Sequence, residues 1–317
     1  MISLTNKKIL ITGGSGFLGS SLIKKLKKEF KKTKLIIPRS KEFNLAKEND
    51  VKKLFKKFKK IDFVIHLASS HGGLYYNIRN SGSIYYTNTI LNTHLIHYAM
   101  KSKIKKIVCA GTVDSYPKNI SPPWSESDFW NGFPEETSAA YAFSKKMMII
   151  QGYAYRKQFN FKTINLLFMN LYGPKDNFNL NQSHVIPAII KKIYYAKKKR
   201  QKYIELYGNG SQKREFLFVD DAADSLILAL RKYDSPTPLN IGTGKTYSIK
   251  SVARKLIKYI DPKIRIKWKK NIETGIKIKK FNIRRAKKMI GFNSKVSLDE
   301  GLIKTIEWYK NRDAKKD

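Results

Sequence analysis

Tyr141 and Lys145, in the segment YAFSK, combine a phenol with an ammonium group that can help it move a proton. Residues four positions apart lie on one face of a helix, so the two side chains are expected to be neighbours. A phenol has a pKa of about 10, and a nearby cation stabilises the phenolate and lowers that pKa. Thr112, at the end of an expected strand, can hydrogen-bond the same substrate oxygen. These three residues are candidates for proton transfer to a substrate oxygen.

A glycine-rich turn, GGSGFLG, lies close to the N-terminus. Its glycines are Gly13, Gly14, Gly16 and Gly19. This spacing is typical of a dinucleotide site, in which glycines permit a tight turn, let backbone N–H groups reach a pyrophosphate, and allow close packing of helix on strand. The turn lies between an expected strand at 7–12 and an expected helix at 17–30, as such a site requires. A dinucleotide cofactor is therefore predicted.

The end of the second expected strand favours NADP over NAD. An acidic residue about 20 positions after the glycine turn is common in NAD sites, whereas an arginine suits the 2′-phosphate of NADP. Here the strand ends in IPRS, with no acidic residue before Glu42. Arg39 is therefore the candidate ligand of the phosphate, and an ordinary surface position is the alternative for it.

Strands and helices that alternate along the chain are expected to position these residues. Short apolar or β-branched runs predict strands at 7–12, 35–37, 63–67, 107–110 and 163–168, and helical spacing predicts helices at 17–30, 50–58 and 83–100. Near-continuous apolar strands alternating with helices indicate an α/β fold with a doubly wound parallel sheet, the Rossmann type.

A second lobe is expected after residue 170, where Gly173-Pro174 and an asparagine-rich stretch interrupt the alternation. Residues 217–242 again have the character of sheet and helix. The predicted cofactor domain is therefore 1–170 plus about 217–242, and the predicted α/β substrate lobe is about 171–216 plus 243–317.

The net charge of +40 raises the question of nucleic-acid binding. The lysines, however, fall on solvated faces of amphipathic helices, as Lys24, Lys25, Lys27 and Lys28 do, and similar doublets recur along the whole chain. A lysine-rich surface without a nucleic-acid partner is therefore expected. The same field attracts an anionic pyrophosphate.

No apolar run approaches the ~18 residues that span a bilayer, so no membrane partner is expected. The single cysteine, Cys109, cannot form an internal disulfide and lies in an apolar, strand-like run. A cytoplasmic protein without a metal site is the prediction.

Seven segments, in this order along the chain, resemble the extended short-chain dehydrogenase/reductases, the NAD-dependent epimerase/dehydratase family. They are GGSGFLGSSL, HLASSHGGLYYN, AGTVDSYP, YAFSKK, NLYGPKDNF, SHVIPAII and GNGSQKREFLFVDDAA. Within that family the chain is most similar to the GDP-L-fucose synthases. The resemblance implies an NADPH-dependent epimerase/reductase that acts on a GDP-4-keto-6-deoxyhexose or a related GDP-4-keto-sugar.

The resemblance also implies roles for individual residues. Thr112, Tyr141 and Lys145 would be the reductase triad, with Tyr141 protonating the sugar 4-oxygen, and His184 would be the acid that reprotonates carbon during epimerisation. The implied cofactor contacts are Gly13, Gly16, Phe17, Gly19, Arg39, Leu67, Ala68, Tyr141 and Lys145. The implied substrate contacts are Asn170, His184, Val185, Lys191, Tyr207 and Arg214, and the geometry of an arginine suits a phosphate. A homodimer through helices near 85–101 and 140–158 is also implied.

Asp114 departs from the pattern, because GDP-L-fucose synthases carry a cysteine there as the base that removes protons beside the 4-keto group. A carboxylate can do this work, but an aspartate with a pKa of about 4 is a weak base unless burial raises that pKa. Altered epimerisation, for example at one carbon only, and plain 4-keto reduction both remain open.

Three further alternatives remain. A 4,6-dehydratase would need an acid where Val113 stands, which valine cannot supply. A 4-epimerase of the UDP-galactose type would hold NAD and favour an acidic residue near Arg39. A non-enzymatic sensor or nucleic-acid binder predicts loss of the triad, whereas Thr112, Tyr141 and Lys145 are all present.

Overall fold

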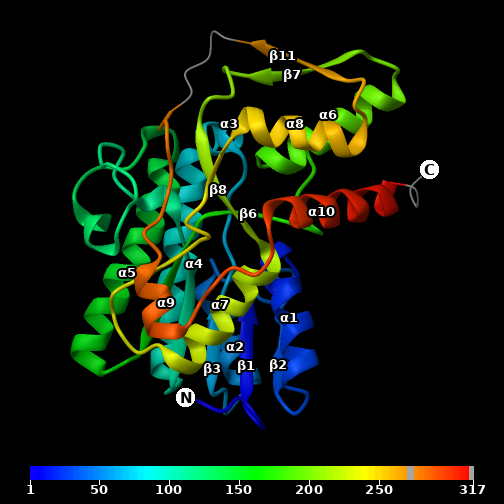
Figure 1. Cartoon of the computed structure of the whole chain (residues 1–317). Helices are drawn as coiled ribbons and strands as arrows, with labels where there is room; N and C mark the ends of the chain where they lie inside the picture. Colours follow the sequence, from blue (N-terminus) through cyan, green and yellow to red (C-terminus); the bar gives the residue numbers. More distant parts are fainter. Residues whose placement is uncertain (270–274, 314–317) are drawn as a thin grey trace.

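A sheet of six parallel strands forms the centre of the protein in the computed structural model, which describes residues 1–269 and 275–313 (Figure 1). The strands are β1 (Lys8–Thr12), β2 (Lys34–Ile36), β3 (Phe63–His66), β4 (Lys106–Thr112), β5 (Thr163–Phe168) and β9 (Leu239–Ile241). Their order is β2-β1-β3-β4-β5-β9, and all neighbours are parallel. From β1 the chain first adds β2 on one side and then crosses over to add β3 on the other side. Sheets of this type bind ligands at that switch in strand order, beyond the carboxyl ends of the strands.

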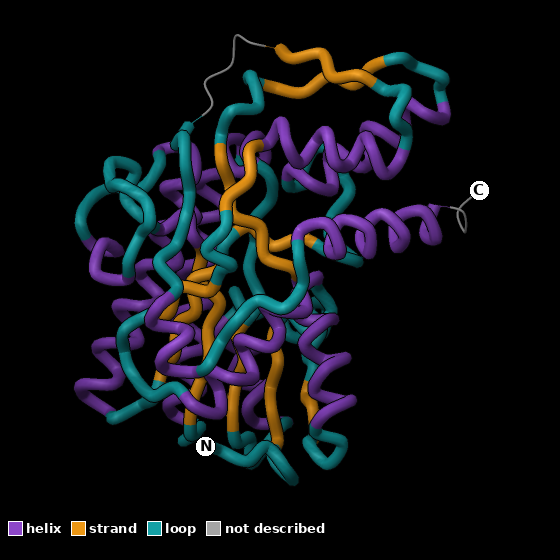
Figure 2. Tube along the Cα trace, viewed as in Figure 1, coloured by secondary structure: helices purple, strands orange, loops and turns teal. Residues whose placement is uncertain are grey.

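Helices cover both faces of this sheet (Figure 2). On one face lie α1 (Phe17–Glu29), α7 (Val219–Lys232) and α9 (Arg284–Ile290); on the other lie α2 (Glu48–Lys57), α4 (Ser81–Lys101) and α5 (Ala139–Phe159). Every residue of β3 and β5 is buried between these layers. Burial on both faces explains why these strands read as continuous apolar runs.

The smaller part of the molecule, at the top of Figure 1, has its own apolar core. It contains the three-stranded sheet β10-β8-β6 (Thr246–Ser248, Lys213–Phe218 and Asn170–Tyr172), the pair β7 (Tyr203–Tyr207) and β11 (Arg265–Lys269), and the helices α6 (Val185–Lys198), α8 (Ile249–Ile260) and α10 (Leu298–Asp313). The remaining elements are the short helix α3 (Leu74–Arg79) and the 3-10 helices Val113–Ser115, Glu126–Trp130 and Glu136–Ser138.

The predicted α/β fold with a parallel sheet is confirmed, and the differences concern the ends of elements. The strand expected at 107–110 extends over Lys106–Thr112, because Gly111 and Thr112 continue the pairing with β5. Thr112 is thus the last residue of β4. The division into two lobes at the stated residue numbers stays a prediction.

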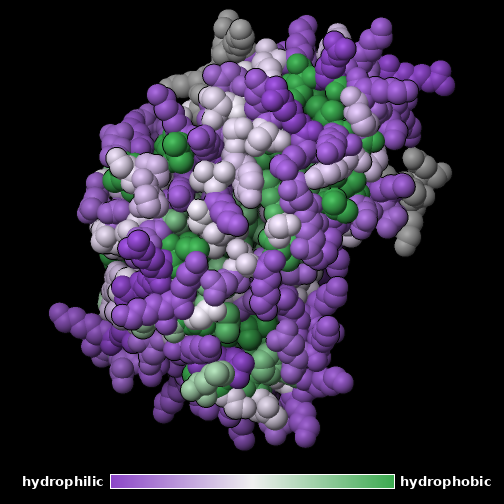
Figure 3. Space-filling model, viewed as in Figure 1, coloured by the Kyte–Doolittle hydropathy of each residue, from purple (hydrophilic) through white to green (hydrophobic). Residues whose placement is uncertain are grey.

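The lysine-rich surface lies in solvent. Lys24, Lys27 and Lys28 are exposed on α1, whereas Lys25 pairs with Asp224 at 2.6 Å. Figure 3 shows a mainly hydrophilic face with scattered apolar areas. Among the described helices, none is long and apolar enough to cross a membrane.

Candidate active site

The glycine turn brings the backbone of β1 and α1 against the segment after β3. Gly13 has a φ of +68°, and a Cβ added there would lie 2.7 Å from the backbone nitrogen of Ala68. A Cβ on Gly19 would overlap the carbonyl oxygen of Gly13. Gly16 is the N-cap of α1, so the free N–H groups of the first helical turn lie beside this backbone. The turn therefore fits a cofactor pyrophosphate.

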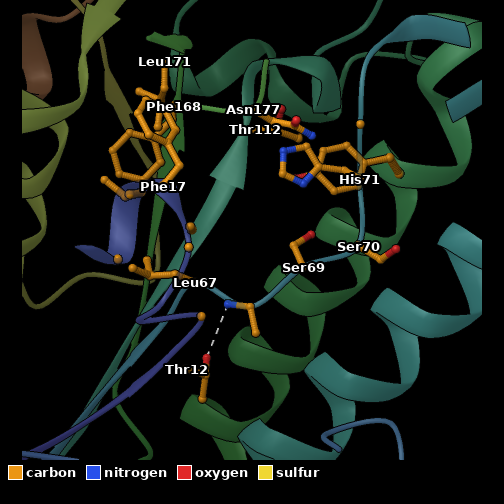
Figure 4. Close-up of a pocket in the computed structure, with 18 of the residues that line it drawn as sticks. Thr12, Phe17, Leu67, Ser69, Ser70, His71, Thr112, Phe168, Leu171 and Asn177 are labelled. Carbon is orange, nitrogen blue, oxygen red and sulfur yellow. Dashed lines mark hydrogen bonds between the residues drawn. The ribbon is translucent and has the colours of Figure 1, made fainter. Parts of the chain in front are cut away.

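A cavity of about 710 Å³ opens at the carboxyl ends of the central strands, where the strand order changes direction (Figure 4). The predicted residues that line it are Gly13, Gly16, Phe17, Gly19, Leu67, Ala68, Thr112, Asp114, Tyr141, Lys145, Asn170 and His184. The fold thus brings the glycine turn and the reactive residues to one cavity.

Tyr141 and Lys145 project from α5 into this cavity, and both are buried. The Lys145 ammonium lies 5.8 Å from the centre of the Tyr141 ring. Burial raises the pKa of the Tyr141 phenol to about 12, and a hydrogen bond with Ser69 lowers it in part. Burial lowers the pKa of the Lys145 ammonium to about 8. The pKa of Tyr141 is thus raised overall, because desolvation of the phenol is the largest influence on it.

Asp114 forms an ion pair that the sequence did not predict. Its Oδ1 lies 2.6 Å from the ammonium of Lys279, and its backbone N–H donates to the Thr112 hydroxyl. Burial alone would raise the pKa of Asp114, but Lys279, His184 and Arg214 lower it below its ordinary value. The carboxylate is consequently a weak base in this structure.

Lys279 is held in place by a backbone segment that crosses to the small sheet. The backbone N–H of Lys279 donates to the carbonyl of Lys213 in β8, and the buried carboxylate of Glu215 accepts the N–H of Phe281 at 3.0 Å. No local pattern marked Lys279, because it is one lysine among many in a basic stretch.

Two histidines meet at the same cavity. His184 is the N-cap of α6, and its ring lies 5.8 Å from the ring of His71. His71, which the sequence analysis did not single out, stacks on Tyr141. Desolvation by the surrounding protein lowers the pKa of His184. Desolvation also lowers the pKa of His71, to about 4, and the nearby charges of His184 and Lys145 lower it further in the same direction.

Five predicted residues lie outside the lining of this cavity, namely Arg39, Val185, Lys191, Tyr207 and Arg214. Arg39 is exposed in the turn after β2, between Pro38 and Ser40, which do line the cavity. Val185 begins α6 and packs against the core of the small part. Arg214, in β8, donates from Nη1 to the carbonyl of Lys213 and lies close enough to Asp114 to lower its pKa.

Lys191 and Lys192 point in different directions from α6. Lys191 lines a second cavity of about 560 Å³ together with Asp176 and Arg312. Lys192 instead lies over the ring of Tyr207, 5.2 Å from its centre, and donates to the carbonyl of Glu205 at 2.8 Å. Adjacent helix residues differ by about 100° in direction, so the choice between them required the structure.

The parallel sheet, the glycine turn and the Tyr141–Lys145 pair together define a Rossmann-type enzyme that uses a nicotinamide dinucleotide. Residues 9–242 match the model of the NAD dependent epimerase/dehydratase family, and the chain belongs to that family. The family predicted from the sequence is thus confirmed, and the class is an NAD(P)-dependent oxidoreductase/epimerase.

Relatives extend this likeness over nearly the whole chain. GDP-L-fucose synthase 1 of Arabidopsis thaliana is 32% identical over 302 residues, which cover 95% of this chain and 93% of the relative. The structure of a GDP-6-OMe-4-keto-L-xylo-heptose reductase from Campylobacter jejuni has a TM-score of 0.91 at 26% identity, covering 98% of this chain and 99% of that chain. MlghC, a GDP-mannoheptose C4 reductase from the same organism with NADP bound, has a TM-score of 0.88 at 27% identity, covering 98% and 100%.

Proposed function

We propose that the protein is an NADPH-dependent epimerase/reductase that acts on a GDP-4-keto-6-deoxyhexose or a related GDP-4-keto-sugar. The observation that carries this proposal is the meeting of Thr112, Tyr141 and Lys145 with the glycine turn at one cavity. The names of the relatives, a GDP-L-fucose synthase and two GDP-heptose reductases, support the substrate class. The lobe of 1–170 plus about 217–242 would hold the cofactor, and the remainder would hold the nucleotide sugar.

NADPH is the proposed cofactor, since NADP is bound in the related MlghC. The backbone at Gly13 and Gly16 would hold the pyrophosphate, and the side chains of Phe17 and Leu67 line the same cavity. Arg39, in the turn after β2 between two residues that line this cavity, remains the candidate for the 2′-phosphate. Bound NADPH would supply the hydride.

Tyr141 is the proposed proton donor to the sugar 4-oxygen. Its pKa of about 12 keeps the phenol protonated at neutral pH, as an acid requires. The Thr112 hydroxyl, at the end of β4, would hydrogen-bond the same oxygen. Lys145 adds positive charge where negative charge develops on the phenol, which stabilises that state. His184, at the N-terminus of α6, is the proposed proton donor to carbon.

Plain 4-keto reduction without epimerisation is a second candidate, favoured by the ion pair of Asp114 with Lys279. Lys279 lowers the pKa of the only carboxylate that the family pattern offers as the carbon base. Two of the related structures are named as reductases, one of them as a C4 reductase.

Basic side chains beyond the reactive centre would hold the diphosphate and nucleotide. Arg214 and Lys192 carry positive charge on β8 and α6, and Tyr207 lies under Lys192. We assign Lys192, rather than the predicted Lys191, to this role, because Lys192 lies over the ring of Tyr207, another implied substrate contact, whereas Lys191 lines the neighbouring second cavity.

A homodimer through α4 and α5 is also proposed. These two helices pack on each other and expose large apolar side chains, Tyr86 on α4 and Met147 and Ile150 on α5. Light scattering of the wild type and of Met147→Glu tests this, since a charge in the contact should shift a dimer toward monomer. A wild-type protein that is monomeric at micromolar concentration contradicts it.

The proposed compartment is the cytoplasm, and the buried free thiol of Cys109 agrees with it.

The test of function is incubation of the purified protein with GDP-4-keto-6-deoxymannose in deuterated water, with and without NADPH. NADPH oxidation together with deuterium in the product identifies an epimerase/reductase. Oxidation without deuterium identifies the plain reductase. No oxidation with this or any other GDP-4-keto-sugar contradicts the proposal.

A further inference from the structure

His71 lies against the proposed catalytic tyrosine. The rings of His71 and Tyr141 are parallel to within 8°, with their centres 5.2 Å apart. Figure 4 shows His71 at the end of the segment that begins with Leu67 and continues through Ser69 and Ser70, and Thr112 lines the same cavity. The imidazole therefore borders the place where Tyr141 and Thr112 would meet the sugar 4-oxygen.

The backbone on both sides of His71 is held by hydrogen bonds. Asn88, which is fully buried in α4, accepts the N–H of Ser70 at 2.8 Å and donates to the carbonyl of Ser70 at 2.7 Å. The N–H of Gly73 donates at 2.7 Å to the carbonyl of Gln182, in the loop that leads to His184. The imidazole is thus presented to the cavity from a fixed backbone, as a binding residue requires.

The ring nitrogens of His71 are free to bind a ligand. Among the described residues, neither nitrogen has a hydrogen-bond partner, and the side chain is exposed to the cavity that it lines. His66, by contrast, bonds Thr12 and Asn92 through its two nitrogens, and His97 bonds Tyr155. The lowered pKa of His71, about 4, leaves the imidazole neutral at pH 7, so that one nitrogen donates and the other accepts.

We propose that His71 is a specificity-determining residue that hydrogen-bonds the hydroxyl on C3 of the sugar, the carbon next to the reacting ketone. This inference rests on the proposed function, because Tyr141 fixes the position of the 4-oxygen. C5, the other neighbour of C4, carries a carbon substituent instead of a hydroxyl. A hydroxyl both donates and accepts, which matches a neutral imidazole.

The test compares GDP-4-keto-6-deoxymannose with the same compound lacking the C3 hydroxyl. For each, kcat/KM is measured from NADPH oxidation, and the ratio of the two values expresses the preference for the hydroxyl. In His71→Ala this ratio should fall roughly tenfold, the worth of one hydrogen bond to an uncharged group. His71→Asn, which keeps a donor and an acceptor, should retain part of the preference. His97→Ala, which removes a histidine outside the cavity, should keep the wild-type ratio.

The following results overturn the proposal and separate it from the proposed function. A wild-type enzyme that oxidises NADPH equally well with both substrates refutes the role of His71 while the reductase activity stands. An unchanged ratio in His71→Ala refutes it as well. Loss of deuterium uptake in His71→Ala with an unchanged ratio would assign His71 to carbon chemistry instead. A wild type that oxidises NADPH with neither substrate nor with another GDP-4-keto-sugar removes the proposed function itself, and the inference with it.

Discussion

Replacing Lys145 with methionine should abolish catalysis and, at the same time, stabilise the cofactor-free protein at neutral pH. The side chain is 1% exposed, and none of the described carboxylates forms an ion pair with it. Burial lowers its pKa from 10.5 to about 8, which corresponds to a penalty of ~3 kcal/mol for the charged form. Methionine has a similar unbranched shape and carries no charge, so the variant avoids this penalty.

The stabilisation should depend on pH in a way that identifies its cause. Below pH 8, both the folded and the unfolded wild-type chain hold the Lys145 proton, and the full penalty applies. Between pH 8 and 10.5 only the unfolded chain holds it, so wild-type stability rises with pH through this group. The advantage of Lys145→Met should therefore fall from ~3 kcal/mol at about pH 7 to less than ~1 kcal/mol at about pH 10.

Urea unfolding of the cofactor-free wild type and of Lys145→Met, at about pH 7 and about pH 10, measures this difference. Lys24→Met, which removes an exposed lysine on α1, is the matched control and should show almost the same change at both pH values. If the free-energy difference between Lys145→Met and the wild type is the same at both pH values, the buried-charge argument is wrong.

Three further variants test the roles of single residues. Tyr141→Phe should slow NADPH oxidation by ~10²- to 10⁴-fold, the usual worth of a positioned acid, with NADPH affinity nearly unchanged in a fluorescence titration; a rate near wild type contradicts the assignment. Lys279→Met leaves the half-buried Asp114 without its cation, so the pKa of that carboxyl rises, and the acidic limb of the kcat/KM profile should move to higher pH. If the limb does not move, the ion pair does not control the reaction. Lys192→Ala should raise KM for the GDP-sugar about tenfold, as loss of a charged hydrogen bond does, whereas Lys191→Ala should not; equal effects of both changes would remove the distinction between them.

The sequence determined the features that depend on local geometry. The tight turn predicted at Gly13 and Gly19 is confirmed, because a side chain at either position would collide with neighbouring backbone. The strand 163–168 was predicted with its exact bounds, since every residue in it is buried and apolar or β-branched neighbours reveal that burial. The four-residue spacing of Tyr141 and Lys145 likewise placed both side chains on one face of α5, whichever way the rest of the chain folds.

Only the tertiary structure decided how these residues behave as a group. Lys279 reaches Asp114 across 165 positions, and no pattern within either segment encodes that contact. The stacking of His71 on Tyr141 depends on how the loop after β3 packs against α5. Burial, which spacing alone does not reveal, raised the pKa of Tyr141. Distances and desolvation, which set charges and proton affinities, arise from the packing of remote segments, whereas turns and helix faces arise from neighbours along the chain.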